Sequence, residues 1–153
     1  LYNDREVAFV GGLLHDVGKI VLGSYVAERL PIIQAYCLKY GSSFVEAERA
    51  VMGFDHAEVG GRIAAQWNLP SPLVNAITYH HNPIQNGSIN PFIALIYLGN
   101  RLCFSTPSEV LDSLADEGNA QCMEALRLTP QHISNVLQQL GEQMDKVPLL
   151  TME

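Results

Sequence analysis

Apolar residues recur at helical spacing along almost the whole chain, and strict alternation of apolar and polar residues is nearly absent. A first helix is predicted over the residues that lead up to His15. Gly18 permits a turn after it, and two more helices are predicted, over residues 20–30 and from Pro31 to Gly41. The pattern therefore favours an all-α fold.

Capping residues and prolines mark the starts of the helices. Asn3 or Asp4 can cap the first one. Ser43 with Glu46, and Asp55 with Glu58, have capping-box spacing and predict two helices in the middle of the chain. Prolines at first helical positions predict helices that begin at residues 72, 91, 107 and 130, and a short helical piece is predicted over residues 120–127.

Residues 83–90 lack helical periodicity and are predicted to form a loop after the helix that ends at Asn82-Pro83. The segment from Pro91 to Phe104 is apolar on nearly every face, which is typical of a central, buried helix. We therefore predict one all-α domain over residues 1–153 with about eight helices. It should not be an up-down bundle, because the predicted helices are short and uneven.

The composition limits the classes of function. A chain of 153 residues with 48% hydrophobic residues can bury a single sizeable core, and its formal net charge of −7 repels phosphate backbones, so we expect no nucleic-acid partner. No segment approaches the roughly 18 continuous apolar residues of a membrane span. The N-terminus has no signal-peptide pattern, and Cys37, Cys103 and Cys122 are widely spaced. We expect a cytoplasmic protein with buried, reduced thiols.

Four of the five histidines fall at predicted helix ends, where three pairs stand out: His15-Asp16, Asp55-His56 and His80-His81. Imidazole and carboxylate are common ligands of divalent metals. A single histidine at a helix end is more often a cap than a ligand, but three such pairs in one all-α chain favour a shared site. Gly60 and Gly61 lie within a predicted helix at a cost of about 1 kcal/mol each, which suggests that another backbone packs closely there.

Three stretches resemble the HD superfamily of metal-dependent phosphohydrolases: AFVGGLLHDVGKIVL, DHAEVGGRIAAQWNLPSPLVNAITYHHNP and IALIYLGNRL. The order of the H-x-x-x-G, W-x-L-P and HH-x-P elements is similar to the non-catalytic HD-related output domain (HDOD) branch. The resemblance covers about residues 7–102. It implies an all-helical bacterial signalling module, and we expect the chain to be the C-terminal part of a longer protein. The metal ligands that it implies are His15, Asp16, His56, His80 and His81.

Two ligands of the catalytic family pattern are missing. No histidine precedes His15, and Asn100 stands where the last aspartate is expected. An amide oxygen is a much poorer ligand than a carboxylate, so we expect a degenerate site, with Asn100 as a buried amide bonded to His15, Asp16 or the backbone. The relatives in this superfamily that cleave cyclic dinucleotides, the HD-GYP domains, carry a GYP motif after the paired histidines. This sequence has no such motif, which disfavours cleavage of cyclic dinucleotides. Lys19 either meets a substrate phosphate or is simply a solvated charge.

Three functions follow from the resemblance. The preferred one is a regulatory module that binds a protein partner, other domains of the same protein or an effector, with at most a weakly held divalent metal and no enzymatic activity. The second is an active metal-dependent phosphohydrolase acting on a nucleotide or phosphoester, with Lys19 as a phosphate-binding residue. The third is a nucleotide sensor that does not cleave its ligand.

Overall fold

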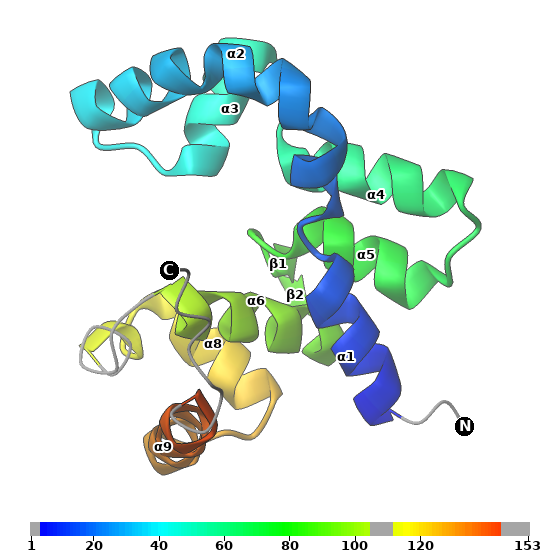
Figure 1. The fold of residues 1–153 in the computed structure, drawn as a ribbon. Coiled ribbons are helices and arrows are strands. Elements are labelled where there is room, and N and C mark those ends of the chain that lie inside the picture. Colours follow the sequence, from blue (N-terminus) through cyan, green and yellow to red (C-terminus); the bar gives the residue numbers. More distant parts are fainter. Residues whose placement is uncertain (1–3, 105–111, 145–153) are drawn as a thin grey trace, which may run out of the picture.

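The computed structural model describes residues 4–104 and 112–144, which form eight helices and one short hairpin (Figure 1). The helices are α1 (Asp4–Leu14), α2 (Val17–Tyr40), α3 (Phe44–Met52), α4 (His56–Gln66), α5 (Ser71–Tyr79), α6 (Pro91–Phe104), α8 (Glu117–Ala125) and α9 (Pro130–Met144). The all-α prediction is confirmed, as are the predicted caps of α3 and α4. Ser43 and Glu46 make both bonds of the capping box, and the Asp55 side chain accepts a hydrogen bond from the Glu58 amide.

The prediction of two helices over residues 20–41 is wrong, because α2 continues through Pro31. A proline inside a helix removes one hydrogen bond, to the carbonyl four residues earlier. Both Pro31 and Ala27 are exposed, so that water can reach the carbonyl that loses its partner. Gly18 is likewise no turn residue, since it lies in the first turn of α2.

The predicted loop over residues 83–90 contains an antiparallel hairpin of two-residue strands, β1 (Ile84–Gln85) and β2 (Ser88–Ile89). Asn86 and Gly87 connect them with φ angles of 51° and 74°. Two positive φ values in a two-residue connection are typical of a type I′ turn, for which Asn-Gly is the preferred sequence. The hairpin signal was therefore present in the sequence.

Some predictions fall outside the described residues. They are the cap at Asn3 and the start of a helix at Pro107; the Asp4 side chain is also outside the description.

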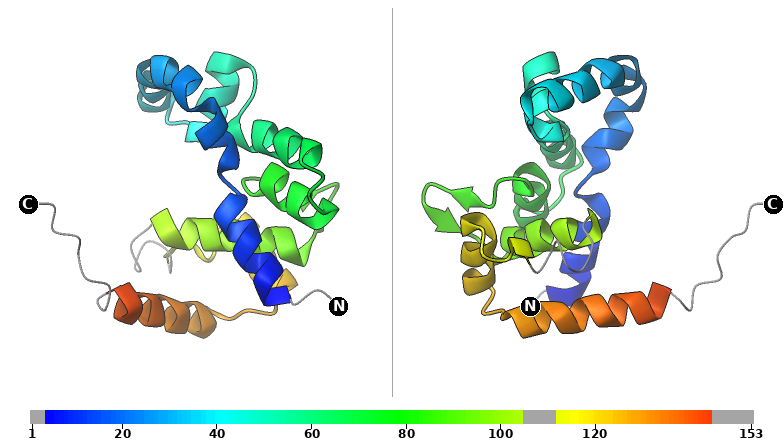
Figure 2. Two further views of the ribbon diagram at one scale, coloured as in Figure 1. Left: turned by 45° about the vertical axis from the view of Figure 1, so that its right-hand side comes forward. Right: turned by 90° about the vertical axis from the view of Figure 1, so that its left-hand side faces the viewer.

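The helices form two groups, joined by α1 and α5. α2 packs on α3 and α4, and α4 lies beside α5, while α6 contacts α8 as well as α1 and α5. Figure 2 shows α2 and α3 at one end of the molecule and α9 along the other. α6 is central, as predicted, and buries Ile93, Ala94, Ile96 and Leu98.

Two apolar clusters take the place of the single core that the composition suggested. One joins α6, α8 and α9 through Ala94, Leu98, Cys122, Met123 and Ile133, and the other joins α2, α4 and α5 through Val17, Ala64 and Ile77.

The three cysteines are unpaired, but only Cys122 is buried; Cys37 is half-buried and Cys103 is exposed, so the prediction of three buried thiols is wrong. Among the described residues, no single helix is long and apolar enough to cross a membrane. One sharply bent pair, Arg5–Gly23 with Tyr25–Tyr40, passes the same test by length and composition only.

Candidate metal centre

The predicted site residues come together at the ends of four helices. His15 and Asp16 connect α1 to α2, His56 is the first residue of α4, and His80 and His81 follow the last turn of α5. His56 and His80 are buried, and the other three are half-buried. The helix ends thus place one carboxylate and four imidazoles in a single pocket.

Glycines bring the start of α2 against the start of α4. A Cβ on Gly18 would overlap the carbonyl oxygen of His56 and would lie 2.9 Å from the amide nitrogen of Gly60. A Cβ on Gly60 would lie 3.1 Å from the amide nitrogen of Gly18. The prediction that another backbone packs closely is therefore confirmed at Gly60, whereas Gly61 faces mainly the side chain of Thr78. The close approach of Gly18 and Gly60 sets Asp16 beside His56.

Four side chains form a group that could hold one metal ion: Asp16, His56, His80 and His81, with one ligand atom from each lying within 4.8 Å of the others. The Oδ1 atom of Asp16 is 3.2 Å from Nε2 of His56 and 3.5 Å from Nε2 of His80. The Nε2 atoms of His56 and His81 are 2.9 Å apart. His15 is not in this group, but its Nε2 lies 3.4 Å from Oδ2 of Asp16.

The opposite ring nitrogens of three histidines are held by hydrogen-bond acceptors. Nδ1 of His15 donates to the carbonyl of Gly12 at 2.7 Å, and Nδ1 of His80 donates to that of Ile77 at 2.7 Å. Nδ1 of His56 lies 2.5 Å from Oε2 of the buried Glu48. Because an acceptor fixes the proton on Nδ1, all three Nε2 atoms turn their lone pairs toward Asp16.

Lone pairs that face a carboxylate require a positive charge between them, either a proton on Nε2 or a metal ion. Eight buried side-chain atoms of the described residues have no hydrogen-bond partner of good geometry. Five belong to this pocket: His15 Nε2, Asp16 Oδ1, Glu48 Oε1, His80 Nε2 and Asn100 Oδ1. Buried polar atoms are rarely left unpaired, so this concentration fits a site built for a cation.

The pKa shifts describe the same charge balance. Burial would raise the pKa of Asp16, but hydrogen bonds from His15, His56, His80 and Lys19 outweigh it and hold that pKa well below its ordinary value. Burial disfavours the cation of His56, but Asp16 and Glu48 outweigh it and raise the pKa. The hydrogen bond to Asp16 is the main cause that raises the pKa of His15. Burial and the neighbouring imidazoles lower the pKa of His81 to about 3, which keeps this ring neutral.

The structure places Lys19 and Asn100 at the edge of the group. Nζ of Lys19 donates to Oδ2 of Asp16 at 2.7 Å. The Asn100 side chain on α6 lies against His15 and raises its pKa as a hydrogen-bond partner, although its Oδ1 makes no bond of good geometry. Asn100 as a whole is half-buried, while its Oδ1 atom is shielded from solvent.

Glu48 is not among the site residues predicted from the sequence, although the sequence carries a signal for it. Positions 44, 45, 48, 51 and 52 form one face of α3, and Glu48 is the charged residue among Phe44, Val45, Val51 and Met52. A carboxylate in the middle of an apolar face needs a buried partner.

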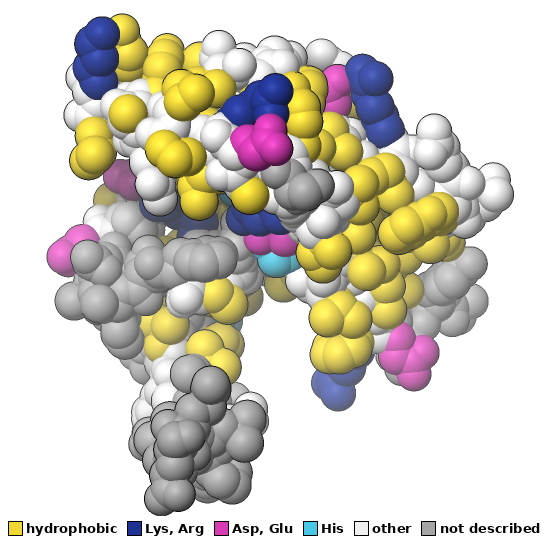
Figure 3. Space-filling view, turned by 45° about the horizontal axis from the view of Figure 1, so that its top comes forward, with side chains coloured by type: hydrophobic (Ala, Val, Ile, Leu, Met, Phe, Trp, Pro, Cys, Tyr) yellow, Lys and Arg dark blue, Asp and Glu magenta, His cyan; other side chains and the backbone are white. Residues whose placement is uncertain are grey.

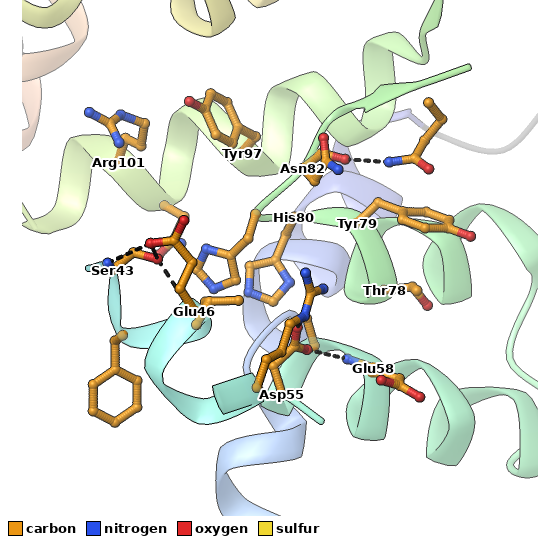
Figure 4. Close-up of a pocket in the computed structure, with 17 residues that line it drawn as sticks. Ser43, Glu46, Asp55, Glu58, Thr78, Tyr79, His80, Asn82, Tyr97 and Arg101 are labelled. Atoms are coloured by element: carbon orange, nitrogen blue, oxygen red, sulfur yellow. Dashed lines mark hydrogen bonds and ion pairs between the residues drawn. The ribbon is translucent and has the colours of Figure 1, made fainter. Parts of the chain in front are cut away.

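Two hollows reach the pocket. One of about 660 Å³ lies between α3, α5 and α6 and reaches His80, His81, Tyr97 and Asn100. Figure 4 shows His80 in its floor, with Arg101 and Tyr97 on the α6 side. The other, of about 560 Å³, lies between α2 and α3 and reaches Lys19, Glu48, His56, His81 and Asn100. The two hollows therefore reach three of the four candidate ligands, His56, His80 and His81.

Three imidazoles and one carboxylate suit zinc, iron(II) or manganese(II). The four residues of the group would hold the ion, which would act as a Lewis acid toward a bound anion.

Comparisons with known proteins agree with this fold. Two solved structures share the fold, and each match covers 90% of this chain: a candidate phosphohydrolase from Shewanella amazonensis SB2B (20% identity, TM-score 0.69) and an HDOD domain protein of unknown function from Geobacter sulfurreducens (19% identity, TM-score 0.65). An uncharacterised protein from Treponema pallidum (strain Nichols) is 29% identical over 134 residues, which is 84% of this chain.

The chain spans 51% of each solved structure and 26% of the Treponema protein. The family model of the HDOD domain matches residues 1–83, more than half of the sequence. This chain therefore belongs to the HDOD family.

Proposed function

We propose that this chain is a regulatory module of bacterial signal transduction that binds one divalent metal ion in its histidine pocket and does not hydrolyse phosphoesters. The observation that carries the proposal is the convergence of the His56, His80 and His81 Nε2 atoms with the Asp16 carboxylate. With the Nδ1 atoms of His56 and His80 already bonded, the role left to their Nε2 atoms is to share a cation with Asp16.

The absence of turnover follows from the ligand set. Asp16 is the one carboxylate among the four grouped residues, and Asn100 contributes a neutral amide beside His15. A metal held by three neutral imidazoles and a single carboxylate can order the helix ends that it joins. We propose that this ordering, rather than chemistry, is its contribution to the module.

We further propose that the module works by docking to another helical segment of the same longer polypeptide, through the outer surfaces of α1 and α2. Eight of the thirteen exposed large hydrophobic side chains of the described residues lie on these helices: Phe9, Leu13, Ile20, Val21, Tyr25, Ile32, Leu38 and Tyr40. Figure 3 shows apolar side chains spread over the face that α2 presents, with charged side chains and a histidine in the hollow beneath it. The relatives of greater length support an intramolecular partner.

Metal titration tests the central part of the proposal. The chain is stripped with a chelator and titrated calorimetrically with zinc and manganese, in the wild type and in His80→Ala and His132→Ala. His132 is the matched control, because it is exposed on α9 and its Nδ1 accepts a bond from the Thr129 amide. We expect one site per chain that His80→Ala abolishes and His132→Ala leaves unchanged. Equal effects of the two variants would contradict the proposal.

A metal-dependent phosphohydrolase is the second candidate. The observation that favours it is the Lys19 ammonium, which lies beside Asp16 and lines the α2–α3 hollow, where a substrate phosphate could meet it. Hydrolysis of a generic phosphodiester in the presence of manganese tests this candidate. We expect no turnover; two metals per chain, with an activity that His15→Ala removes, would establish the enzyme instead.

A further inference from the structure

We propose that Glu48 is a positioning residue of this pocket, which fixes the ring of His56 so that its Nε2 atom is available to a metal ion. The inference rests on the proposed metal binding, and it assigns the buried carboxylate of α3 a part in that site.

Every hydrogen bond that the structure gives the Glu48 carboxylate goes to one residue. Oε2 lies 2.5 Å from Nδ1 of His56 and accepts the backbone N–H of the same residue at 3.2 Å. Oε1 has no hydrogen-bond partner of good geometry among the described residues. Glu48 therefore bonds both the ring and the backbone of His56 at the start of α4.

Burying Glu48 and His56 removes both groups from water, which costs free energy and indicates that the pair has a role beyond packing. Glu48 and His56 are each 1% exposed. A buried ion pair often stabilises a fold no more than apolar residues of the same volume would, because both groups lose their hydration. The neighbouring positions on this face of α3 are apolar, so that a leucine at position 48 would suit the packing of the helix.

The benefit lies in the state of the His56 ring. A neutral imidazole carries its proton on either nitrogen, and a proton on Nε2 would block metal binding there. The carboxylate keeps the proton on Nδ1 and also makes Nε2 more electron-rich, as in carboxylate–histidine–metal triads. His15 and His80 rely on backbone carbonyls for the same purpose. His56 is held by a full negative charge, so the strongest orienting contact falls on this ring.

The test compares three variants of α3. Glu48→Gln keeps the length of the side chain and removes its charge, and Glu48→Leu removes the acceptor altogether. The control is Glu46→Gln, two residues away on the same helix, since glutamine preserves the capping box with Ser43. Thermal unfolding of the metal-free proteins first establishes that each variant folds.

Two readouts follow. The first is the His56 Nδ1–H signal in the histidine ring 15N–1H spectrum of the metal-free protein, and the second is zinc affinity by competition with a chromophoric chelator. We expect the His56 signal to shift in Glu48→Gln and to disappear in Glu48→Leu. In Glu46→Gln, the His56 signal and the zinc affinity should both stay unchanged. Zinc affinity should fall about tenfold in Glu48→Gln and about 100-fold in Glu48→Leu.

The two readouts separate the possible failures. A wild type that binds no zinc would contradict the proposed function, and the ring signal alone would then decide the role of Glu48. An unchanged His56 signal in Glu48→Leu would overturn the positioning role. So would a loss of zinc affinity of the same size in Glu46→Gln.

Discussion

The α-carbon of Gly18 lies so close to the carbonyl oxygen of His56 that a Cβ at position 18 would overlap it. This contact joins the first turns of α2 and α4 and sets the distance between Asp16 and His56. Gly18→Ala should therefore lower the free energy of unfolding by about 2–3 kcal/mol, as overpacking does, and weaken metal binding as Asp16 moves away. Chemical denaturation and metal titration measure the two effects.

Gly23→Ala is the control in the same helix. A Cβ on Gly23 would meet nothing within 4 Å, and alanine favours the helix over glycine by about 0.5–1 kcal/mol. Gly23→Ala should stabilise the chain by about that amount and leave metal affinity unchanged. Similar losses in the two variants would mean that the contact between Gly18 and His56 is not what assembles the pocket.

Asn100→Asp should tighten metal binding by about tenfold, because it adds a carboxylate beside His15. The same charge repels Asp16 when no metal is bound, so the metal-free variant should unfold at a lower temperature than the wild type. The rise in melting temperature on addition of zinc should then be larger than in the wild type. Unchanged affinity would show that position 100 does not act on the site.

The lowered pKa of His81 predicts how the stability of the metal-free chain depends on pH. Its pKa falls from 6.5 to about 3 on folding, so between these values the unfolded chain binds a proton that the folded chain does not. Its contribution to stability is complete above pH 6.5 and is lost as the pH falls toward 3.

The wild type should therefore lose more unfolding free energy than His81→Gln between pH 7 and pH 4.5, by about 1–2 kcal/mol after allowing for the partial exposure of the ring. His56 acts in the opposite sense, because its pKa is raised: its contribution is present below pH 6.5 and is lost as the pH rises through the raised pKa. His56 is present in both proteins, so the comparison isolates His81. Parallel pH profiles would contradict a neutral His81.

The outer surface of α2 should bind apolar probes without contributing to stability. Ile20 and Leu38 are 80% and 88% exposed. The double variant Ile20→Asp/Leu38→Asp should reduce binding of a hydrophobic dye at least twofold. It should change the free energy of unfolding by no more than about 0.5 kcal/mol, the range of surface substitutions. Val136→Asp on α9 is the control. An equal loss of dye binding in the control would remove the support for a docking surface on α2.

The sequence was sufficient to predict the class of fold, most helix starts and the histidines and aspartate that meet in the pocket, but not Glu48. Caps such as Ser43 and Asp55 act through local hydrogen bonds, which a short stretch of sequence specifies completely. The same local rule failed at Pro31, where the cost of a missing hydrogen bond depends on solvent exposure and hence on the folded structure.

The pocket itself shows where local reasoning ends. The helix-end histidines and the Gly60–Gly61 pair were visible as local features, and they indicated a shared site. Glu48 lies eight residues before His56, on a different helix, and nothing in its immediate neighbours specifies its partner. That His56, His80 and His81 group with Asp16, while His15 contacts Asp16 but stays outside the group, depends on tertiary distances.

X-ray absorption spectroscopy of the chain loaded with one equivalent of zinc is the sharpest test of the proposed metal site, because it reports the atoms bound to the metal. We expect one ion per chain, bound by three imidazole nitrogens and a carboxylate oxygen, with the imidazole signal reduced in His80→Ala and unchanged in His132→Ala. A short metal–metal distance from a two-ion centre, or a spectrum without imidazole ligands, would contradict this expectation.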